Sequence, residues 1–294
     1  MSRSPGMTTL SGSLLLTFRE LWAMRLTQAM LAVATLAWLL LSFAMNMDVV
    51  EGSLTALRIF GFESTPTEGH WDEAAGEYVS QAVSLDNFLI GINTFVFGAA
   101  YFLGTLLGLF ATMPLVNGFL EQGRVDLLLS KPLSRSRLLF GHLTGVWITV
   151  FLLATYLVGG VWLTLSLKTG VWMPHFLVAI PIITLMFAVM YSVILTISIG
   201  SRSPGLGLVV TYGLIFFSII LASHEQLVPV LSGTSAALFM TIYHILPNFA
   251  EVVLVQTQLV EEAAVISWYP LVSSLLFGFV TYGIGFFWFS RRDF

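Results

Sequence analysis

Few residues of this 294-residue chain have the types and spacing that catalysis requires. A phosphate-binding P-loop needs Gly-Lys followed by Ser or Thr, because the lysine reaches the phosphates and the hydroxyl holds magnesium. The chain has two lysines, and they follow Ser130 and Leu167 rather than glycine. The sequence therefore excludes a P-loop ATPase, and it predicts that the chain is not an enzyme.

Two further catalytic patterns are incomplete. His224 and Glu225 begin like the helix of a zinc protease, but Val228 stands where the second histidine ligand belongs. Ser235 and His244 loosely match a membrane serine protease, without an obvious oxyanion hole. An intramembrane enzyme would require one of these two residues, and alanine at both positions would test that hypothesis.

Sulfur ligands give no better candidate. Met45 and Met47 carry the thioethers that Cu(I) prefers, but in a chain with 11 methionines packing explains such a pair. There are no cysteines, which excludes disulfides, thiolate metal sites and iron–sulfur clusters. We therefore predict no catalytic, cofactor-binding or metal site in this chain.

The composition is that of a membrane protein. Hydrophobic residues make up 57% of the chain and charged residues 10%, with a mean hydropathy of +0.90. Soluble domains carry about 25% charged residues, which keep their surfaces in water. We expect an all-α membrane protein with one transmembrane domain over residues 1–294.

Stretches without charged residues predict six transmembrane helices, since a helix needs about 20 mainly apolar residues to cross a bilayer. A seventh stretch, 226–250, has an apolar core only from Ala236 to Leu246 and predicts an interfacial or re-entrant helix. The predicted spans are 26–47, 88–113, 139–167, 175–199, 205–223 and 267–289, with outer loops at 48–87, 168–174 and 224–266 and cytoplasmic loops at 114–138 and 200–204.

The basic residues predict the orientation, because Lys and Arg accumulate in cytoplasmic loops. With the amino end inside, ten of the 12 basic residues are cytoplasmic, and only Arg58 and Lys168 lie outside. The acidic residues divide in the opposite way. We therefore expect both termini in the cytoplasm of a bacterial or archaeal cell, with the chain in its inner membrane.

Two segments outside the spans have two explanations each. Phe18, Leu21 and Trp22 share one helical face, with Thr17 and Glu20 on the polar face, and predict an amphipathic helix along the inner leaflet. It is either a simple anchor or an elbow connected to a cytoplasmic partner. The acidic outer loop at 48–87 is either a solvated loop that follows the charge rule or a surface for an outer-face accessory protein.

The predicted spans contain no Asp, Glu, Lys or Arg. Ion-coupled transporters usually keep such a group in the membrane, so its absence counts against proton coupling. The polar residues of the spans are neutral, and we expect most of them to make hydrogen bonds between helices. They are Asn93, Thr94, Tyr101, Thr105, Thr112, Tyr156, Ser192, Thr196, Thr211 and Tyr212.

Two pairs of glycines have the spacing of close helix contacts. Gly104 and Gly108 form one pair, and Gly141 and Gly145 form the other. Small residues four positions apart let helix backbones approach each other in membranes. We expect tight packing at both pairs, either within the chain or between two copies.

The cytoplasmic loop between the second and third spans has an unusual pattern. The segment Glu121–Ser130 is predicted to be helical with a ridge of leucines, to end before Pro132, and to restart after Ser134. A basic loop that fixes topology explains the arginines, but it does not explain three leucines between charges in water. The pattern favours a docking helix.

This loop carries a family resemblance. The run EQGRVDLLLSKPLSRSRLLFGHLTG resembles the hallmark stretch of permease subunits in the second exporter class of ABC transporters, where an acidic-Gly segment precedes LLSxPxSR and GK. The run YHILPN from Tyr243, the terminal RRDF and the six spans extend the resemblance over essentially the whole chain. It is nearest to permeases of multicopper-enzyme and nitrous-oxide-reductase maturation. One departure is His142, where many relatives have lysine.

The resemblance implies partners that the chain itself lacks. Two permease copies pair with two cytoplasmic P-loop ATPase subunits, which bind ATP and Mg, and the short helix between spans two and three inserts into a groove on the ATPase. Membrane lipid surrounds the dimer, and no nucleic acid is involved. The ATPase-coupling residues that the resemblance implies are Glu121, Gly123, Arg124, Asp126, Leu127, Leu128, Lys131, Pro132 and Arg135.

The function predicted on this basis is that of the membrane subunit of an ATP-driven exporter, or of a machine that transmits motion across the membrane. The sequence does not name a cargo. The alternative is an ATP-independent secondary transporter or channel, against which the uncharged spans count.

Overall fold

The computed structural model describes residues 15, 17–50, 53–64, 67–72, 77–120, 135–261, 264–265 and 267–291. Within these residues, six helices are long and apolar enough to cross a membrane. The predicted all-α membrane fold with six transmembrane helices is therefore confirmed, and the chain is an integral membrane protein. The predicted coupling helix lies outside the described residues.

The helices of the bundle run beyond the expected spans at several ends. They are α2 (Arg25–Leu39) with the π-helical turn η1 (Leu40–Ala44), α3 (Leu85–Ala99), the π-helical turn η2 (Ala100–Gly104), α4 (Thr105–Leu120), α6 (Arg135–Thr169), the 3-10 turn η3 (Pro174–Val178), α7 (Ala179–Ser201), α8 (Pro204–Ala222) and α12 (Tyr269–Arg291). Short helical segments join α8 to α12: α9 (His224–Leu227), η4 (Val228–Val230), α10 (Gly233–Ile245) and α11 (Val252–Val260). Residues 17–23 are also helical.

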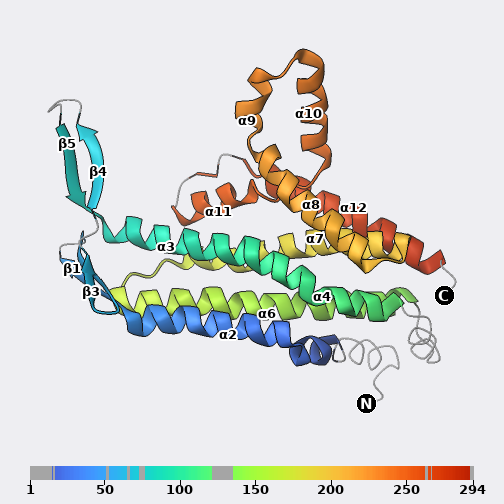
Figure 1. Cartoon of the computed structure of the whole chain (residues 1–294), viewed down its shortest axis with the longest axis horizontal. Coiled ribbons are helices and arrows are strands. Elements are labelled where there is room, and N and C mark those ends of the chain that lie inside the picture. Colours follow the sequence, from blue (N-terminus) through green and yellow to red (C-terminus); the bar gives the residue numbers. More distant parts are fainter. Residues whose placement is uncertain are drawn as a thin grey trace.

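The bundle has two distinct ends. Figure 1 shows the ends of α4, α7 and α12 near the starts of α2, α6 and α8, with the strands at the opposite end. The described arginines Arg25, Arg137, Arg202 and Arg291 all belong to the first of these ends. Arg58 and Lys168 belong to the strand end, so the division of charge seen in the sequence follows the two ends of the bundle.

The turn between α7 and α8 shows how local sequence positions the helices. Arg202 has a left-handed backbone with φ 58, which ends α7. Ser203 then caps α8 by accepting a hydrogen bond from the Leu206 amide, and Pro204 occupies the first turn, where a missing N–H costs nothing. Two long helices are thereby joined by a turn of two residues.

The outer loop after α2 contains strands that the sequence analysis did not predict. Strands β1 (Met45–Val50), β2 (Ser53–Ile59) and β3 (Phe62–Ser64) form an antiparallel sheet, and β4 (Thr67–Asp72) pairs antiparallel with β5 (Glu77–Ala82). The β2–β3 turn has positive φ at both Phe60 and Gly61, the geometry that suits a two-residue hairpin. In the described residues the strands lie between Met45 and Ala82, so β1 begins within the last three residues of the predicted first span, and the six membrane-spanning segments are helical.

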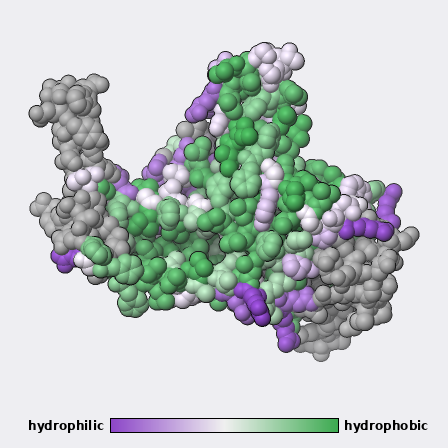
Figure 2. All heavy atoms as spheres, viewed as in Figure 1, coloured by the Kyte–Doolittle hydropathy of each residue, from purple (hydrophilic) through white to green (hydrophobic). Residues whose placement is uncertain are grey.

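The segment α9–η4–α10 stands away from the bundle as a helical hairpin (Figure 1). With 13 residues, α10 is too short to cross a membrane. The surface of the hairpin is nevertheless apolar, since Val230 of η4 is 84% exposed and Leu238 and Ile245 of α10 are each 62% exposed. Figure 2 shows this hairpin mostly in the hydrophobic colour.

Helix α7 is the centre of the bundle, packed against α12, α8, α6 and α4. Glycines on its neighbours allow this packing. A Cβ on Gly278 of α12 would lie 2.9 Å from Val189, and one on Gly207 of α8 would lie 2.7 Å from the Ile194 carbonyl oxygen. Backbones approach closely at such sites because no side chain separates them.

A second, smaller core lies beneath the strands. Met45, Leu85, Leu89, Val161 and Leu165 form it. Beside it, the Lys168 ammonium donates a hydrogen bond to the Met45 carbonyl, which joins the end of α6 to the start of β1. The outer loop is thus fastened to the helices rather than free.

Candidate functional site

The predicted coupling loop lies between two described helices. Its residues Glu121, Gly123, Arg124, Asp126, Leu127, Leu128, Lys131 and Pro132 lie outside the described residues, and Arg135 is the first residue of α6. Helix α4 ends at Leu120, directly before this segment. What the structure defines is therefore how the two flanking helices are held.

The start of α6 is held by buried polar contacts of His142. His142 is 5% exposed, and its Nε2 lies 3.0 Å from the Tyr191 hydroxyl of α7. Its Nδ1 lies 3.3 Å from the Thr17 hydroxyl of the amino-terminal helix. One histidine thus connects three helices at the end of the bundle from which the 121–134 segment leaves.

Apolar side chains surround these polar contacts. Leu139 and Leu143 flank His142 on α6 and are fully buried, and Leu21 is buried beside them in the same core. Thr17, which the sequence places on the polar face of the amino-terminal helix, is also buried, at 4% exposed. The side of this helix that faces the bundle therefore runs through Thr17 and Leu21.

Helix α4 is held differently. The Tyr212 hydroxyl of α8 donates to the Leu106 carbonyl at 2.6 Å. A Cβ on Gly108 would lie 2.9 Å from the Phe187 ring of α7, so these two helices are in close contact there. A Cβ on Gly104, the other member of the predicted pair, would meet no atom within 4 Å.

The second predicted glycine pair, on α6, is buried, since Gly141 and Gly145 are both in the interior. The Gly145 carbonyl accepts a hydrogen bond from the Thr149 hydroxyl of the same helix. Their role in packing between two copies stays a prediction.

Residues 248–250, between α10 and α11, form a junction on the strand side of the bundle. The turn η2, which connects α3 to α4, contacts this junction. The Tyr101 hydroxyl of η2 donates to the Phe249 carbonyl at 2.7 Å, and the two rings stack with centroids 4.3 Å apart. Ser274 of α12 and Ser218 of α8 accept hydrogen bonds from the amides of Asn248 and Ala250. The 248–250 junction therefore ties η2, α8 and α12 together.

An acidic residue borders this junction. The Tyr243 hydroxyl donates to Glu251 Oε2 at 2.8 Å, and the ring of His224 packs against Tyr243 with centroids 4.4 Å apart. Burial raises the pKa of Glu251 above its ordinary value, while the Tyr243 hydrogen bond acts in the opposite direction. The pKa of Tyr243 is also raised, first by burial and then by Glu251.

Residues of both incomplete enzyme patterns make other contacts. The Ser235 hydroxyl is hydrogen-bonded to Ser232 at 2.7 Å, and His244 Nδ1 pairs with the Met240 carbonyl, so the structure gives the serine and histidine separate partners. In the part of the chain that the structure describes, three or more His, Cys, Asp or Glu residues nowhere gather as metal ligands would.

Comparison with known protein families matches residues 17–294 to the family described as ABC-2 family transporter protein. The chain belongs to the ABC-2 transporter family. An ABC-2 permease is a membrane transport component and not itself catalytic, and permeases of this family generally pair with a cytoplasmic ATPase subunit. No curated protein matches the chain.

Membership identifies this chain as an ABC transporter permease, as the 121–145 run predicted. Of the residues that hold α6 and the 248–250 junction, the sequence marks His142 only as a departure from the family pattern and Asn248 only as part of a motif. It gave no signal for Phe249, or for Tyr191 as the partner of His142. Both are apolar or aromatic residues within apolar runs, where the sequence does not distinguish a contact from ordinary packing.

Proposed function

We propose that this ABC-2 permease works as a homodimer with a separate cytoplasmic P-loop ATPase, and that the ATPase engages the segment Glu121–Pro132. The partner would supply the ATP and Mg sites. ATP-driven closure of the partner would move α4 and α6, the helices that enter and leave this segment. The result is either export of a substrate or motion passed to the outer face.

The observation that carries this proposal is the way the two flanking helices are fastened. The His142–Tyr191 contact connects α6 to the central helix α7. Through η2, α4 continues to the 248–250 junction by way of the Tyr101–Phe249 hydrogen bond. Displacement at one end of α4 and α6 would therefore be passed to α7, α8 and α12, because packed helices move as rigid elements.

We also propose that this permease resembles those of enzyme maturation and serves a partner on the outer face. The resemblance of the 121–145 run to permeases of multicopper-enzyme and nitrous-oxide-reductase maturation supports a machine that serves a partner on the outer face. The outer loop supports the same assignment, because its two antiparallel sheets provide a folded surface on that side. The orientation with both termini in the cytoplasm belongs to this proposal as well.

The test is isolation of the tagged permease from its native membrane under mild extraction, followed by identification of stoichiometric partners and an ATP hydrolysis assay. We expect a P-loop ATPase at about one copy per permease, because each permease copy would present one docking segment. Leu128→Asp should leave insertion intact and remove the ATPase, because it places an unpaired charge in an apolar groove.

Glu121→Lys should have the same effect through reversed charge, and Leu231→Asp provides the control. Leu231 is exposed in the turn between η4 and α10, far along the chain from the proposed docking segment. Retention of the ATPase by both loop variants would contradict the docking assignment. A permease that purifies alone under several mild extractions would contradict the pairing itself.

A further inference from the structure

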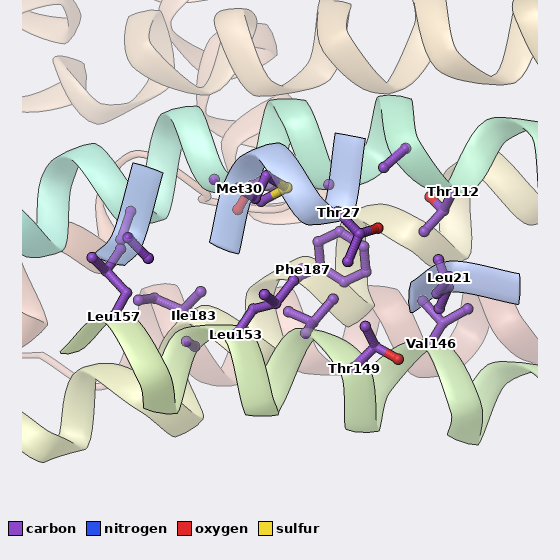
Figure 3. Close-up of a pocket in the computed structure, with 18 residues that line it drawn as sticks. Leu21, Thr27, Met30, Thr112, Val146, Thr149, Leu153, Leu157, Ile183 and Phe187 are labelled. Atoms are coloured by element: carbon purple, nitrogen blue, oxygen red, sulfur yellow. The ribbon is translucent and has the colours of Figure 1, made fainter. Parts of the chain in front are cut away.

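An elongated cavity lies inside one protomer, among α2, α4, α6 and α7. Its volume is about 80 Å³. The α6 residues that line it run from Val146 to Leu157, a length of about 16 Å along the helix. In Figure 3 the labelled side chains Thr27 and Met30 of α2 converge on the same space as Leu153 of α6. The cavity is therefore a narrow slot parallel to the helix axes.

The slot exists because its walls are built from small residues. Ala100, Gly104, Gly108 and Ala111 line one side, and Ala154 lines the other. A Cβ added to Gly104 would meet no atom within 4 Å, so the space next to it is open. Ala100 and Gly104 also bound the π-helical turn η2, and such turns inside α-helices are frequent at functional sites.

One polar atom in the wall has no partner. Thr105 lines the slot and is 1% exposed, and its hydroxyl makes no hydrogen bond to any described residue. The nearby hydroxyls of Thr112 and Thr149 are satisfied by carbonyls of their own helices. Buried hydroxyls are normally hydrogen-bonded, so Thr105 marks a place where an oxygen atom of a ligand would be stabilised.

The slot lies next to a helix on the periphery of the bundle. Helix α2 supplies Met30 and Ala34 to the slot, while its Val33 and Leu36 are 66% and 56% exposed. In a membrane these exposed residues face lipid. Hydrocarbon is therefore the medium at the edge of the slot, and apolar cavities take up apolar molecules rather than water.

We propose that this slot binds a short stretch of one hydrocarbon chain together with the oxygen-bearing group next to it. Volume and shape set this class of ligand. An apolar cavity of about 150 Å³ holds one benzene ring of six carbons, so a slot of about 80 Å³ holds about three methylene groups in single file and excludes a ring. Two sources have this chemistry, the acyl chain of a membrane phospholipid and a free long-chain alcohol.

The site is separate from the proposed ATPase-docking segment. Its ligand approaches from the bilayer, and its lining residues belong to the interior of one protomer. Binding therefore does not require the partner ATPase, and failure of either proposal leaves the other standing.

The experiment uses the full-length permease in lipid nanodiscs with two photoactivatable probes. One is a phosphatidylethanolamine with a diazirine in one acyl chain, and the other is hexadecanol with a diazirine in its chain. Labelled residues are mapped by mass spectrometry. We expect label on the slot-lining residues Thr105, Ala111, Val146 and Leu153, in addition to exposed residues such as Phe95 and Phe279.

Gly104→Leu should reduce label in the slot by about tenfold, because the leucine occupies the space that the chain needs. Gly91→Leu is the matched control, since Gly91 lies on the exposed side of α3 and a Cβ there also meets nothing within 4 Å. This variant should keep the label. Equal melting temperatures would show that both variants fold alike.

The two probes separate the sources. Label from the alcohol that falls in Thr105→Val identifies a free chain whose oxygen binds the Thr105 hydroxyl. Label from the phospholipid that falls in Thr105→Val identifies an acyl chain whose ester oxygen binds that hydroxyl. Label from either probe that is unchanged in Thr105→Val contradicts the role of Thr105. If the unaltered permease is labelled by both probes only on exposed residues such as Phe95 and Phe279, the slot binds neither and the proposal is wrong. That outcome does not depend on the folding of any variant.

Discussion

At the scale of single residues, the buried polar contacts divide into those that join helices and those that do not. Among the ten neutral polar residues expected in the spans, Tyr101, Thr196 and Tyr212 bond to carbonyls of other segments, and Tyr156 pairs with Thr35. Thr112, Ser192 and Thr211 bond within their own helices. Asn93 Oδ1, Thr94 Oγ1 and Thr105 Oγ1 have no hydrogen-bond partner among the described residues. Four of the ten therefore join different segments, and the expectation that most would do so is wrong. Short hydroxyl side chains reach the carbonyl three or four residues back, and this local bond competes with a distant one.

The contact between His142 and Tyr191 yields a matched prediction. Tyr191→Phe removes one hydroxyl and leaves His142 Nε2 buried without that partner, so we expect the permease to lose about 1–3 kcal/mol of stability. Tyr156→Phe removes an equivalent hydroxyl from an exposed bond to Thr35 and should cost much less. Thermal unfolding of both variants in detergent measures the difference. Equal losses would mean that the Tyr191 hydroxyl has no special role.

Glu251 yields a prediction about pH. Its pKa is raised above the ordinary value of 4.5 by burial, so the folded state favours the protonated carboxyl. The resulting stabilisation is fully present below the pKa of the unfolded chain and is lost as pH rises through the raised pKa of the folded chain. The melting temperature should therefore fall over that interval by more in the unaltered permease than in Glu251→Gln.

The control for this prediction is Glu261→Gln. Glu261 is exposed after α11, so this variant removes one carboxylate and keeps the Tyr243–Glu251 hydrogen bond. It should show the same fall in melting temperature as the unaltered permease. A Glu251→Gln variant with an unchanged pH profile would show that Glu251 does not set it.

At the scale of elements, helix identity was predictable and the details of helix packing were not. The long apolar runs predicted the helices, because a bilayer requires about 20 such residues per crossing. The strands at 45–82 were missed, since a polar loop with mixed charges has no simple alternation of apolar and polar residues. The same limit applies to Thr17, which helical periodicity placed on the polar face and the structure buries. The docking helix predicted for the 121–134 segment, the most informative part of the sequence, stays a prediction because these residues lie outside the described ones.

The contact between α7 and α8 tests close packing. A Cβ at Gly207 would lie 2.6 Å from Ser198 Oγ and 2.7 Å from a backbone oxygen, whereas a Cβ at Gly213 of the same helix would meet nothing within 4 Å. We expect Gly207→Ala to cost about 1–3 kcal/mol, because the helices must separate. Gly213→Ala should be neutral or stabilising by about 0.5–1 kcal/mol, as alanine favours helix more than glycine does. Melting temperatures in one detergent would compare them, and equal values would contradict the close contact.

At the scale of the whole molecule, the two ends of the bundle should face opposite compartments. The natural chain has no cysteine, so single cysteines report accessibility without background. Thr67→Cys in the outer sheet should react with a membrane-impermeant maleimide in intact cells. Ser290→Cys at the end of α12 should react only after the membrane is opened, because basic residues accumulate on the cytoplasmic side and we expect this end to lie there. The reverse pattern would invert the orientation.

The length of α6 has a mechanical consequence. Its 35 residues span about 52 Å, whereas the bilayer with its head groups measures about 40–45 Å. A rigid helix that is longer than the bilayer is thick can act as a lever. If α6 pivots about one end by about 10°, its other end sweeps about 9 Å. Through the Lys168 contact to Met45, such a swing would carry the sheet of β1, β2 and β3 sideways, so a small rotation at the basic end of the bundle would become a larger displacement at the strand end.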